Sequence, residues 1–478
     1  MVFCEKEIRK NREKIMFTEE LILYKNFKNG EILEAVSKVY DLTYGLGLNK
    51  PVTSVSSVEP ETVDTVVVKK IISLIVNELI ELAYSHGYRG DLWHTYLTFL
   101  LVNNENPYSM ACEIRGGVSG SINDAALHDF EIFKQLLDID LCKLFSEHNM
   151  TGFDYIRNYD GGSDEGRVFN KRVRDRIVEL SEKLSGANDA SDIKDMVTAF
   201  YKDFGVGKFG LHKAFRAEHR DNTNVILSDK MADVYLKNKT NVEILPITNI
   251  AHVDFSDLVG YESQKQKLID NTEAFVNHRP CNNCLLFGEA GTGKSSSIKA
   301  ILNKYYDQGL RIIEIYKHQF RDLEDIISQI KNRNYRFIIY MDDLSFEEFE
   351  VEYKYLKAVI EGGLEKKPEN VLIYATSNRR HLIKESFNDR NDYDEDLHSS
   401  DTKQEKMSLS SRFGVTIYFP SPEKKEFNNI VKELAARYDI DMKEDELVLE
   451  ANKWEISHGG LSGRTASQFI DYLRGFKK

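Results

Sequence analysis

Short apolar runs alternate with amphipathic segments in the second half of the chain. Five of the apolar runs have the length and composition of buried strands: 284–287, 311–316, 336–341, 371–376 and 415–419. Intervening segments such as Leu323–Ile330 and Tyr353–Ile360 repeat apolar residues at helical spacing. Because strands that alternate with helices usually form a parallel sheet with crossover connections, a five-stranded parallel α/β domain is expected here.

Helical patterns alone occupy the rest of the chain. After Pro422 they cover Glu423–Tyr438, Glu444–Ile456 and Ser462–Phe476. In the first 240 residues they cover Glu61–Ser85, a segment that begins at Asp91, Ala125–Phe145 and Val168–Leu184. The pattern therefore predicts a mostly helical N-terminal domain at 1–240, an α/β domain at 241–420 and a small helical lid at 421–478.

Composition and charge narrow the class of protein. The 478 residues are 41% hydrophobic and 29% charged, with a net charge of −13. These values are typical of a globular protein and argue against a surface whose main task is to bind nucleic-acid backbone. The first residues lack the apolar core of a signal peptide, and the most apolar run, Ile71–Leu82, is interrupted by Asn77 and Glu78. We expect a cytoplasmic protein with no membrane partner.

Cysteines and histidines do not predict a metal site. Cys281 and Cys284 have C-x-x-C spacing, but no second pair of ligands accompanies them, so two small residues that flank a turn are the favoured interpretation. The histidines of the first half, such as His86 and His94, lack the spacing of metal ligands. Trp93, with its neighbouring aromatics Tyr96 and Phe99, could form a partner face, but core packing is favoured because the aromatics recur at helical spacing.

The strongest candidate site is the stretch Gly288-Glu289-Ala290-Gly291-Thr292-Gly293-Lys294-Ser295, which matches G-x-x-x-x-G-K-[ST]. Its glycines let the backbone bend so that N–H groups point at phosphate oxygens. Lys294 can reach the β- and γ-phosphates, and the Ser295 hydroxyl can bind Mg²⁺. A strand is expected before this stretch and a helix from Ser296 to Tyr305 after it, with its N-terminus toward the phosphates. This context disfavours the alternative, a glycine-rich turn without a ligand.

Polar residues follow two of the predicted strands. Asp342 and Asp343 end the strand at 336–341, where Asp342 can hold Mg²⁺ through water and Asp343 can polarise the attacking water. Asn378 follows the strand at 371–376 and could orient the same water or contact the γ-phosphate. The alternative for all three is an ordinary capped strand end, since Asp and Asn are common in turns.

Two arginines near the end of the chain could act on phosphate. Arg412, in Ser408-Leu409-Ser410-Ser411-Arg412-Phe413-Gly414, could complete the site of a neighbouring subunit by stabilising charge on the transferring phosphoryl group. Arg464, at the start of the last predicted helix, could reach the γ-phosphate of its own subunit. Both could otherwise be surface charges.

In the order of these motifs, residues 250–478 resemble an AAA+ ATPase. In this resemblance, Walker A is the phosphate loop together with the next residue, Ser296, and Walker B is Phe337–Asp343. Asn378 corresponds to sensor 1, Arg412 to the arginine finger and Arg464 to sensor 2. Val259-Gly260-Tyr261 resembles the segment that lies against adenine in this superfamily. The resemblance implies binding of ATP with Mg²⁺ and a homo-oligomer, as a ring or spiral, in which Arg412 acts in trans.

The residue sequences of three segments resemble more closely one uncharacterised bacterial AAA+ family of unknown function. These segments are Asp342–Phe346, Ala375–His381 and Ser408–Gly414, and the helical first half resembles that family as well. One residue departs from the usual AAA+ pattern, because Asp343 stands where most members have Glu. Aspartate is one methylene shorter, so slow hydrolysis is plausible. Glu347 or Glu348 could substitute, although the spacing does not show it.

Several functions stay open at this point. The leading hypothesis is an ATPase that remodels or regulates an unidentified protein partner held by the first half. The second is a slow, ATP-dependent binding switch, and the third, disfavoured by the acidic charge, is a nucleic-acid-associated loader. A protein unfoldase is less favoured because Tyr316–Phe320 lacks an aromatic–apolar–glycine pore loop. The acidic segment Glu385–Lys406 is expected to be a solvated loop, with docking on a neighbour as the alternative.

Overall fold

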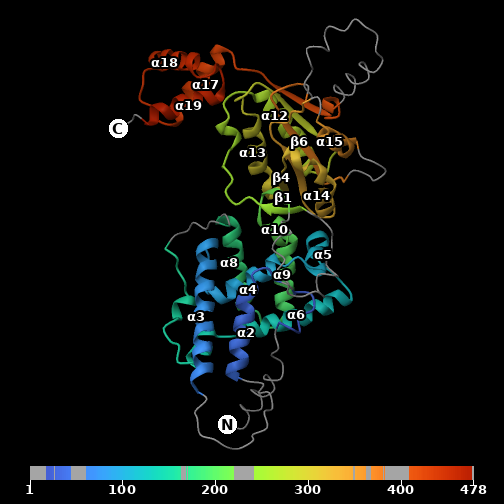
Figure 1. Cartoon of the computed structure of the whole chain (residues 1–478), viewed down its shortest axis with the longest axis vertical. Coiled ribbons are helices and arrows are strands. Elements are labelled where there is room, and N and C mark those ends of the chain that lie inside the picture. The colour runs from blue at the N-terminus through green and yellow to red at the C-terminus, as the bar shows by residue number, and fades with distance from the viewer. Residues whose placement is uncertain are drawn as a thin grey trace, which may run out of the picture. The chain divides into compact units, whose positions relative to one another are not determined.

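The structure is a computed structural model that describes residues 18–25, 27–44, 61–162, 168, 171–219, 242–347, 350–361, 368–380, 382 and 409–475 (Figure 1). The predicted acidic loop at 385–406, and Glu348, lie outside these residues. The chain divides into two compact units, Met1–His212 and Lys213–Lys478. Within the described ranges, no helix combines the length and the apolar character needed to cross a membrane.

The first unit is helical. Its α-helices are α2 (Glu31–Tyr44), α3 (Glu61–His86), α4 (Leu92–Asn103), α5 (Pro107–Arg115), α6 (Ser121–Leu137), α7 (Leu141–Ser146), α8 (Lys171–Ser185), α9 (Ala190–Phe204) and α10 (Gly207–Leu211). Helix α4 packs against α3, α6, α8 and α9, and nearly all of its residues are buried. Trp93, Tyr96 and Phe99 belong to this core, as the favoured interpretation of their spacing predicts.

The single helix predicted over Ala125–Phe145 is wrong. Helix α6 ends at Leu137, and α7 begins at Leu141. The break has a local cause, because the Asp140 side chain accepts a hydrogen bond from the backbone N–H of Lys143 at 3.1 Å and so caps a new helix. The apolar spacing on both sides of the break conceals it in the sequence.

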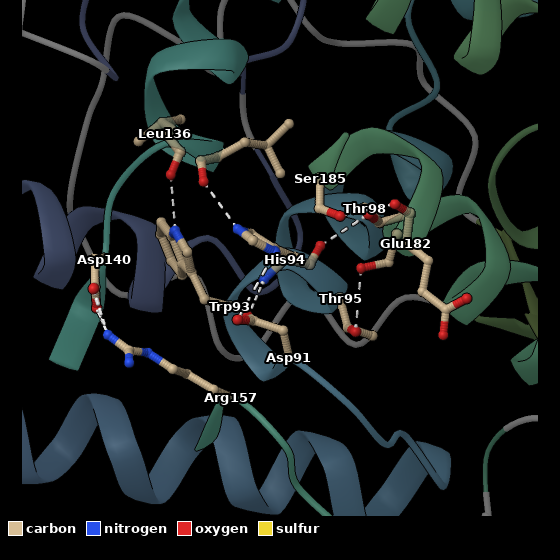
Figure 2. A network of polar contacts seen from close by, with 12 residues as sticks. Asp91, Trp93, His94, Thr95, Thr98, Leu136, Asp140, Arg157, Glu182 and Ser185 are labelled. Atoms are coloured by element: carbon tan, nitrogen blue, oxygen red, sulfur yellow. Dashed lines mark hydrogen bonds and ion pairs between the residues drawn. The ribbon is translucent and has the colours of Figure 1, made fainter. Parts of the chain in front are cut away.

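Polar side chains of α4 hold the end of α6 (Figure 2). The Trp93 indole Nε1 donates a hydrogen bond to the carbonyl oxygen of Leu136 at 2.8 Å. Nε2 of His94 lies 2.9 Å from the carbonyl oxygen of Leu137. The last carbonyls of a helix have no partner inside the helix, so these side chains supply one. His94 therefore has a structural task at this position.

The second unit is built on a mixed sheet. Among the residues that the structure describes, its seven strands are β1 (Ala214–His219), β2 (Val242–Pro246), β3 (Cys284–Gly288), β4 (Leu310–Glu314), β5 (Arg336–Met341), β6 (Val371–Ser377) and β7 (Val415–Phe419). Their order across the sheet is β2-β1-β4-β5-β6-β3-β7. Every neighbouring pair is parallel except β1 and β2. Strands β3 to β7 are the five predicted ones, and Cys284, the first residue of β3, is a buried free thiol.

The prediction of a sheet with only five strands is wrong, because β1 and β2 extend it beyond β4. Both come from near the boundary predicted at 240, and β1 lies in the part of the chain expected to be helical. Phe215 and Ala217 of β1 face the interior, whereas Arg216 between them is exposed. Short edge strands with charged residues carry little of the apolar signal that identifies a central strand.

Helices cover both faces of the sheet. They are α12 (Glu262–Val276), α13 (Lys294–Tyr305), α14 (Leu323–Ile330) and α15 (Glu352–Glu361), and Figure 1 shows α12 and α13 on one side and α14 and α15 on the other. Short 3₁₀ turns lie at Phe255–Asp257, Tyr306–Gln308 and Lys317–Asp322 in this unit and at Asp154–Ile156 in the first. Apolar residues of α12 and α13, such as Leu268 and Ile301, share one core cluster with the strands.

The described residues after the sheet contain three helices, which we call the lid: α17 (Lys424–Arg437), α18 (Glu444–Ser457) and α19 (Gly463–Gly475). They have their own core, which includes Phe427, Leu447 and Phe469. Val259, from the connector before α12, packs against this core. The connector thus joins the lid to the phosphate-loop region.

Candidate functional site

The carboxyl ends of three neighbouring strands define the site. Strand β6 lies between β3 and β5, and all three run parallel. The glycine-rich loop follows β3, the two aspartates follow β5, and Asn378 follows β6. Ligands of open α/β sheets bind at this edge of the strands.

The loop takes conformations that favour glycine. Gly288, Gly291 and Gly293 have φ angles of 136°, 75° and 91°. A β-carbon on Gly288 would lie 2.0 Å from the backbone oxygen of Phe419 in the adjacent strand β7, so no side chain fits there. The close approach of β7 and the left-handed turn after β3 together shape the loop that opens onto α13.

Lys294 lies at the start of α13 and is buried. Its Nζ donates to the backbone oxygens of Gly288 at 2.8 Å and Glu289 at 2.6 Å, and to Oδ1 of Asn378 at 3.1 Å. Burial lowers the pKa of Lys294, although the charge of Asp343 opposes the shift. The ammonium therefore lies between the loop and the tip of β6, where an anionic ligand would compensate its desolvation.

One oxygen of Asp342 accepts three hydrogen bonds. Ser295 Oγ donates to Oδ1 at 2.7 Å, the Tyr340 hydroxyl donates to the same atom at 2.7 Å, and Thr376 Oγ1 donates to it at 2.5 Å. Desolvation raises the pKa of Asp342, but the hydrogen bonds from Thr376, Tyr340 and Ser295 outweigh it, so the pKa lies below the ordinary value. The carboxylate is held ionised and oriented.

Asp343 is held by the tip of β6. Asn378 Nδ2 donates to Oδ1 of Asp343 at 2.7 Å, and the backbone N–H of Asp343 donates to Thr376 Oγ1 at 2.9 Å. The φ angle of Asp343 is 49°, in the left-handed region that aspartate adopts more readily than most residues. Lys294, Asn378 and Asp343 thus form one hydrogen-bonded chain across the site.

A cavity of about 600 Å³ opens in front of these residues. Its walls include residues 290–297 of the loop and α13, both aspartates, Thr376 and Asn378. The remaining walls come from the connector before α12, from α12 itself, from the end of β7 and from the lid: Asp257, Leu258, Val259, Tyr261, Lys265, Phe419, Ile430, Leu434, Gly463, Arg464 and Ser467. The cavity therefore has a polar part at the strand tips and an apolar part between the connector and α17.

The apolar part is bounded by Tyr261 and the lid. The Tyr261 hydroxyl donates to the backbone oxygen of Pro420 at 2.7 Å, and burial raises the pKa of this tyrosine to about 12. Val259 lines the cavity, while Gly260 has a φ angle of 80° and is not among the lining residues. An apolar slot next to a phosphate loop has the character of a site for a flat base.

The two arginines lie in different places. Arg464 lines the cavity, and its backbone N–H donates to the oxygen of Gly291 at 3.2 Å. Arg412 does not line the cavity and forms an ion pair with Glu361 at the end of α15. Gly288 and Glu289 also lie outside the lining, although both accept hydrogen bonds from Lys294.

The donor set fits Mg²⁺. Ser295 and Asp342 supply hard oxygen atoms within 2.7 Å of each other beside the phosphate loop. Mg²⁺ prefers oxygen ligands and is commonly held by one or two carboxylates together with substrate phosphates and water. Ser295 and Asp342, the two predicted metal ligands, are thus a compatible pair.

Sequence reasoning missed Thr376 and Tyr340. Both flank predicted site residues at a spacing of two, since Tyr340 precedes Asp342 and Thr376 precedes Asn378. Residues two apart in a strand face the same side of the sheet. This periodicity was the available signal, because any side chain that shares a face with Asp342 or Asn378 lies near the same cavity.

The second unit matches a family of proteins. Residues 229–477, more than half of the chain, match the family described as "Protein of unknown function (DUF815)". The chain belongs to this family. The prediction that the chain belongs to a family of unknown function is confirmed. The family description assigns no activity to this DUF815 protein.

Individual proteins resemble parts of the chain. The replication factor C large subunit of Staphylothermus marinus is 36% identical over 72 residues, which are 15% of this chain and 16% of that protein. Two mutant forms of RuvB from Thermotoga maritima each share 17% identity over 47% of this chain, with a TM-score of 0.34, and cover 65% and 66% of those chains. The RuvB structure titled a Holliday junction branch migration motor shares 14% identity over 46% of this chain and 72% of its own, with a TM-score of 0.29. At this level of likeness, none of them assigns a partner to the DUF815 protein.

Proposed function

We propose that the DUF815 protein binds and hydrolyses ATP with Mg²⁺. One observation carries the proposal: the glycine-rich loop, Lys294, Ser295, both aspartates and Asn378 meet at a single cavity with an apolar slot beside it. These residues come from three strands that are far apart in the sequence. A purely structural role does not require a buried ammonium, two strand-tip carboxylates and open loop amides to face the same space.

Each residue has a distinct task in this proposal. Backbone N–H groups of the loop and Lys294 bind the phosphates, and Arg464 reaches the γ-phosphate from the lid. Mg²⁺, when bound through Ser295 and Asp342, neutralises charge on the β- and γ-phosphates. Asp343 accepts a hydrogen bond from the attacking water and aligns it with the γ-phosphorus, while Asn378 orients the Asp343 carboxylate. Val259 and Tyr261 form the wall for adenine, and Gly260 joins them without lining the cavity.

The site is completed by a second subunit. Arg412 lies outside its own cavity, which is compatible with a role in trans in a ring or spiral of identical chains. Its ion pair with Glu361 keeps the guanidinium in a defined orientation on the subunit that carries it. An arginine supplied in trans stabilises charge on the transferring phosphoryl group.

The work done by hydrolysis is remodelling or regulation of a macromolecular partner in the cytoplasm. The helical first unit is the proposed holder of that partner. The names of two similar proteins, a replication factor and a branch migration motor, keep a nucleic-acid-associated loader as an alternative. The net charge of −13 favours a protein partner over nucleic acid.

Turnover measurements test the proposal. Phosphate release from ATP is measured for the wild type, Lys294→Ala and Arg412→Ala, each with Mg²⁺ and with EDTA. We expect the wild type to release phosphate only with Mg²⁺ and both variants to lose at least tenfold in rate. Equal rates of phosphate release for all three proteins would contradict ATP hydrolysis at this site.

A slow binding switch is the second candidate, favoured by one residue. Asp343 stands where a glutamate would reach one methylene further, and it is drawn toward Asn378 by a 2.7 Å hydrogen bond. In this case the purified protein retains about one ATP per chain with negligible turnover. Rapid phosphate release would rule out the switch.

A further inference from the structure

The hydroxyl of Thr376 contacts both aspartates of the site. Oγ1 donates to Oδ1 of Asp342 at 2.5 Å and accepts the backbone N–H of Asp343 at 2.9 Å. The backbone oxygen of Thr376 also accepts the N–H of Leu344 at 2.7 Å. The residue is only 1% exposed, and these bonds use its single hydroxyl proton and one of its two lone pairs.

We propose that Thr376 is a positioning residue that aims Asp342 at the metal and Asp343 at the attacking water. The inference rests on the proposed ATPase function and deepens it. Thr376 lines the cavity, but in this proposal its hydroxyl makes no bond to nucleotide or metal and acts only through the two aspartates. Tyr340 assists at Asp342 alone.

The Asp342 part of the argument concerns its two oxygens. Oδ1 accepts hydrogen bonds from Thr376, Tyr340 and Ser295, so both of its lone pairs are fully used. These bonds fix the plane of the carboxylate and direct Oδ2 away from them. Removing a donor frees the carboxylate to rotate. Loss of a residue that holds a metal ligand typically weakens metal binding 10-fold to 100-fold.

The Asp343 part concerns the backbone. A φ angle of 49° is unusual for a residue other than glycine, and the side chain leaves the backbone in a different direction from that of an extended residue. The N–H bond to Thr376 and the Asn378 bond to the carboxylate hold Asp343 from both ends. The conformation, rather than the length of the side chain, sets where this shorter carboxylate points.

A purely structural role is the competing explanation, and the chain offers a matched control. Ser377, the next residue, is also fully buried and also ties the turn after β5, because its Oγ donates to the backbone oxygen of Leu344 at 2.8 Å. Its hydroxyl bonds to backbone groups of Leu344 and Arg379. Ser377→Ala therefore removes a buried hydroxyl from the same turn without removing a bond to Asp342 or Asp343.

The experiment measures Mn²⁺ affinity by electron paramagnetic resonance on the full chain loaded with a non-hydrolysable ATP analogue. The variants are Thr376→Val, which removes the hydroxyl, Thr376→Ser, which keeps it, Tyr340→Phe and Ser377→Ala. We expect Thr376→Val and Tyr340→Phe to weaken Mn²⁺ binding at least tenfold, and Thr376→Ser and Ser377→Ala to stay within threefold of the wild type. Analogue affinity in EDTA stays unchanged in all of them.

Single-turnover rates at saturating Mn²⁺ separate the two aspartates. Tyr340→Phe is expected to regain the wild-type rate, whereas Thr376→Val stays at least tenfold slower because Asp343 remains misplaced. Unchanged Mn²⁺ affinity in Thr376→Val, or an equal loss in Ser377→Ala, would overturn the inference. If Thr376→Val fails to fold, Thr376→Ala, which removes the same hydroxyl without adding a methyl group, is measured in its place with the same expected losses. A wild type that binds no analogue would instead overturn the proposed function, and this inference with it.

Discussion

At the scale of single residues, the site depends on backbone conformations that few side chains tolerate. Gly288 approaches the backbone oxygen of Phe419 so closely that a β-carbon would meet it at 2.0 Å. Asp343 keeps a left-handed conformation because Thr376 and Asn378 hold it. The loop and the aspartate turn are therefore shaped by their neighbours as much as by their own sequence.

Gly288→Ala is expected to be far more damaging than Gly309→Ala. Both glycines have positive φ angles, 136° and 89°, so alanine is strained at both. A β-carbon on Gly309 meets nothing within 4 Å, and the cost there is about 1 kcal/mol of backbone strain. At Gly288 the clash with strand β7 adds to that strain. Thermal unfolding of the two variants checks the difference, and similar melting temperatures would contradict it.

His86 makes the stability of the first unit depend on pH. Burial lowers its pKa to about 4, although a hydrogen bond to Leu82 opposes the shift. The unfolded state binds the proton near pH 6.5, so stability is fully present above that pH and is lost as the pH falls toward 4. Between pH 7 and pH 5 the loss due to His86 is about 2 kcal/mol.

Urea unfolding at pH 7 and pH 5 measures this loss. In a Trp454→Phe background, Trp93 is the remaining one of the two tryptophans and reports on the first unit. We expect His86→Leu to lose about 2 kcal/mol less stability over this interval than the parent. The exposed His458→Ala variant serves as control and keeps the parent's dependence. Equal losses for His86→Leu and the parent would contradict the assignment.

At the scale of elements, the lid and the phosphate loop meet at the start of α19. The backbone N–H of Arg464 donates to the oxygen of Gly291, and a β-carbon on Gly291 would lie 3.0 Å from both Cβ of Arg464 and Oγ of Ser462. The first turn of α19 thus packs directly on the loop. If the proposed nucleotide binding shifts the loop, we expect the shift to reach the lid through this contact.

Arg464→Ala tests the role of α19 at the cavity. We expect the affinity for ATP to fall about tenfold, which corresponds to the loss of about 1.4 kcal/mol from a charge-assisted contact with phosphate. The melting temperature of the nucleotide-free protein changes little because the Arg464 side chain is exposed. Arg474→Ala, at the other end of the same helix, is the control. Isothermal titration calorimetry measures both affinities, and equal values would exclude a phosphate contact by Arg464.

At the scale of the whole molecule, one chain does not contain every group of the proposed site. Arg412 is paired with Glu361 and lies outside the cavity lining of its own chain. In the assembly of identical chains proposed above, this arginine would reach the cavity of a neighbouring chain. The arginine then acts only where two subunits meet.

Mixing two inactive variants tests the assembly. Lys294→Ala chains keep Arg412 but lack a working cavity, whereas Arg412→Ala chains keep the cavity. Because the groups would come from different chains, mixed assemblies contain some complete sites. We expect phosphate release from the mixture to exceed that of either variant alone several-fold at equal ratios. A mixture that stays as inactive as its components, although the chains co-assemble, would contradict action in trans.

Much of the second unit could be predicted because its signals are local. All five predicted strands form, and Leu323–Ile330 is helical over the range predicted. Strands β3 to β6 are almost entirely buried, so their apolar runs are easily recognised. Strand β7 and α14 bury one side each, and their apolar residues recur at strand and helix spacing. The edge strands β1 and β2, and the break between α6 and α7, carry no such run. Their formation depends on pairing with β4 and on a cap at Asp140.

The amino-acid sequence by itself determined the chemical groups of the candidate site, since a glycine-rich loop, a lysine and strand-tip carboxylates are set by residue type and spacing. Tertiary structure decided which of them meet. The order of strands across the sheet results from long-range packing, and it brings β6 between β3 and β5. Only that order lets Thr376 bridge two aspartates and Asn378 join Lys294 to Asp343. Local periodicity does not predict a hydrogen bond between residues more than thirty positions apart, because tertiary packing decides which distant segments become neighbours.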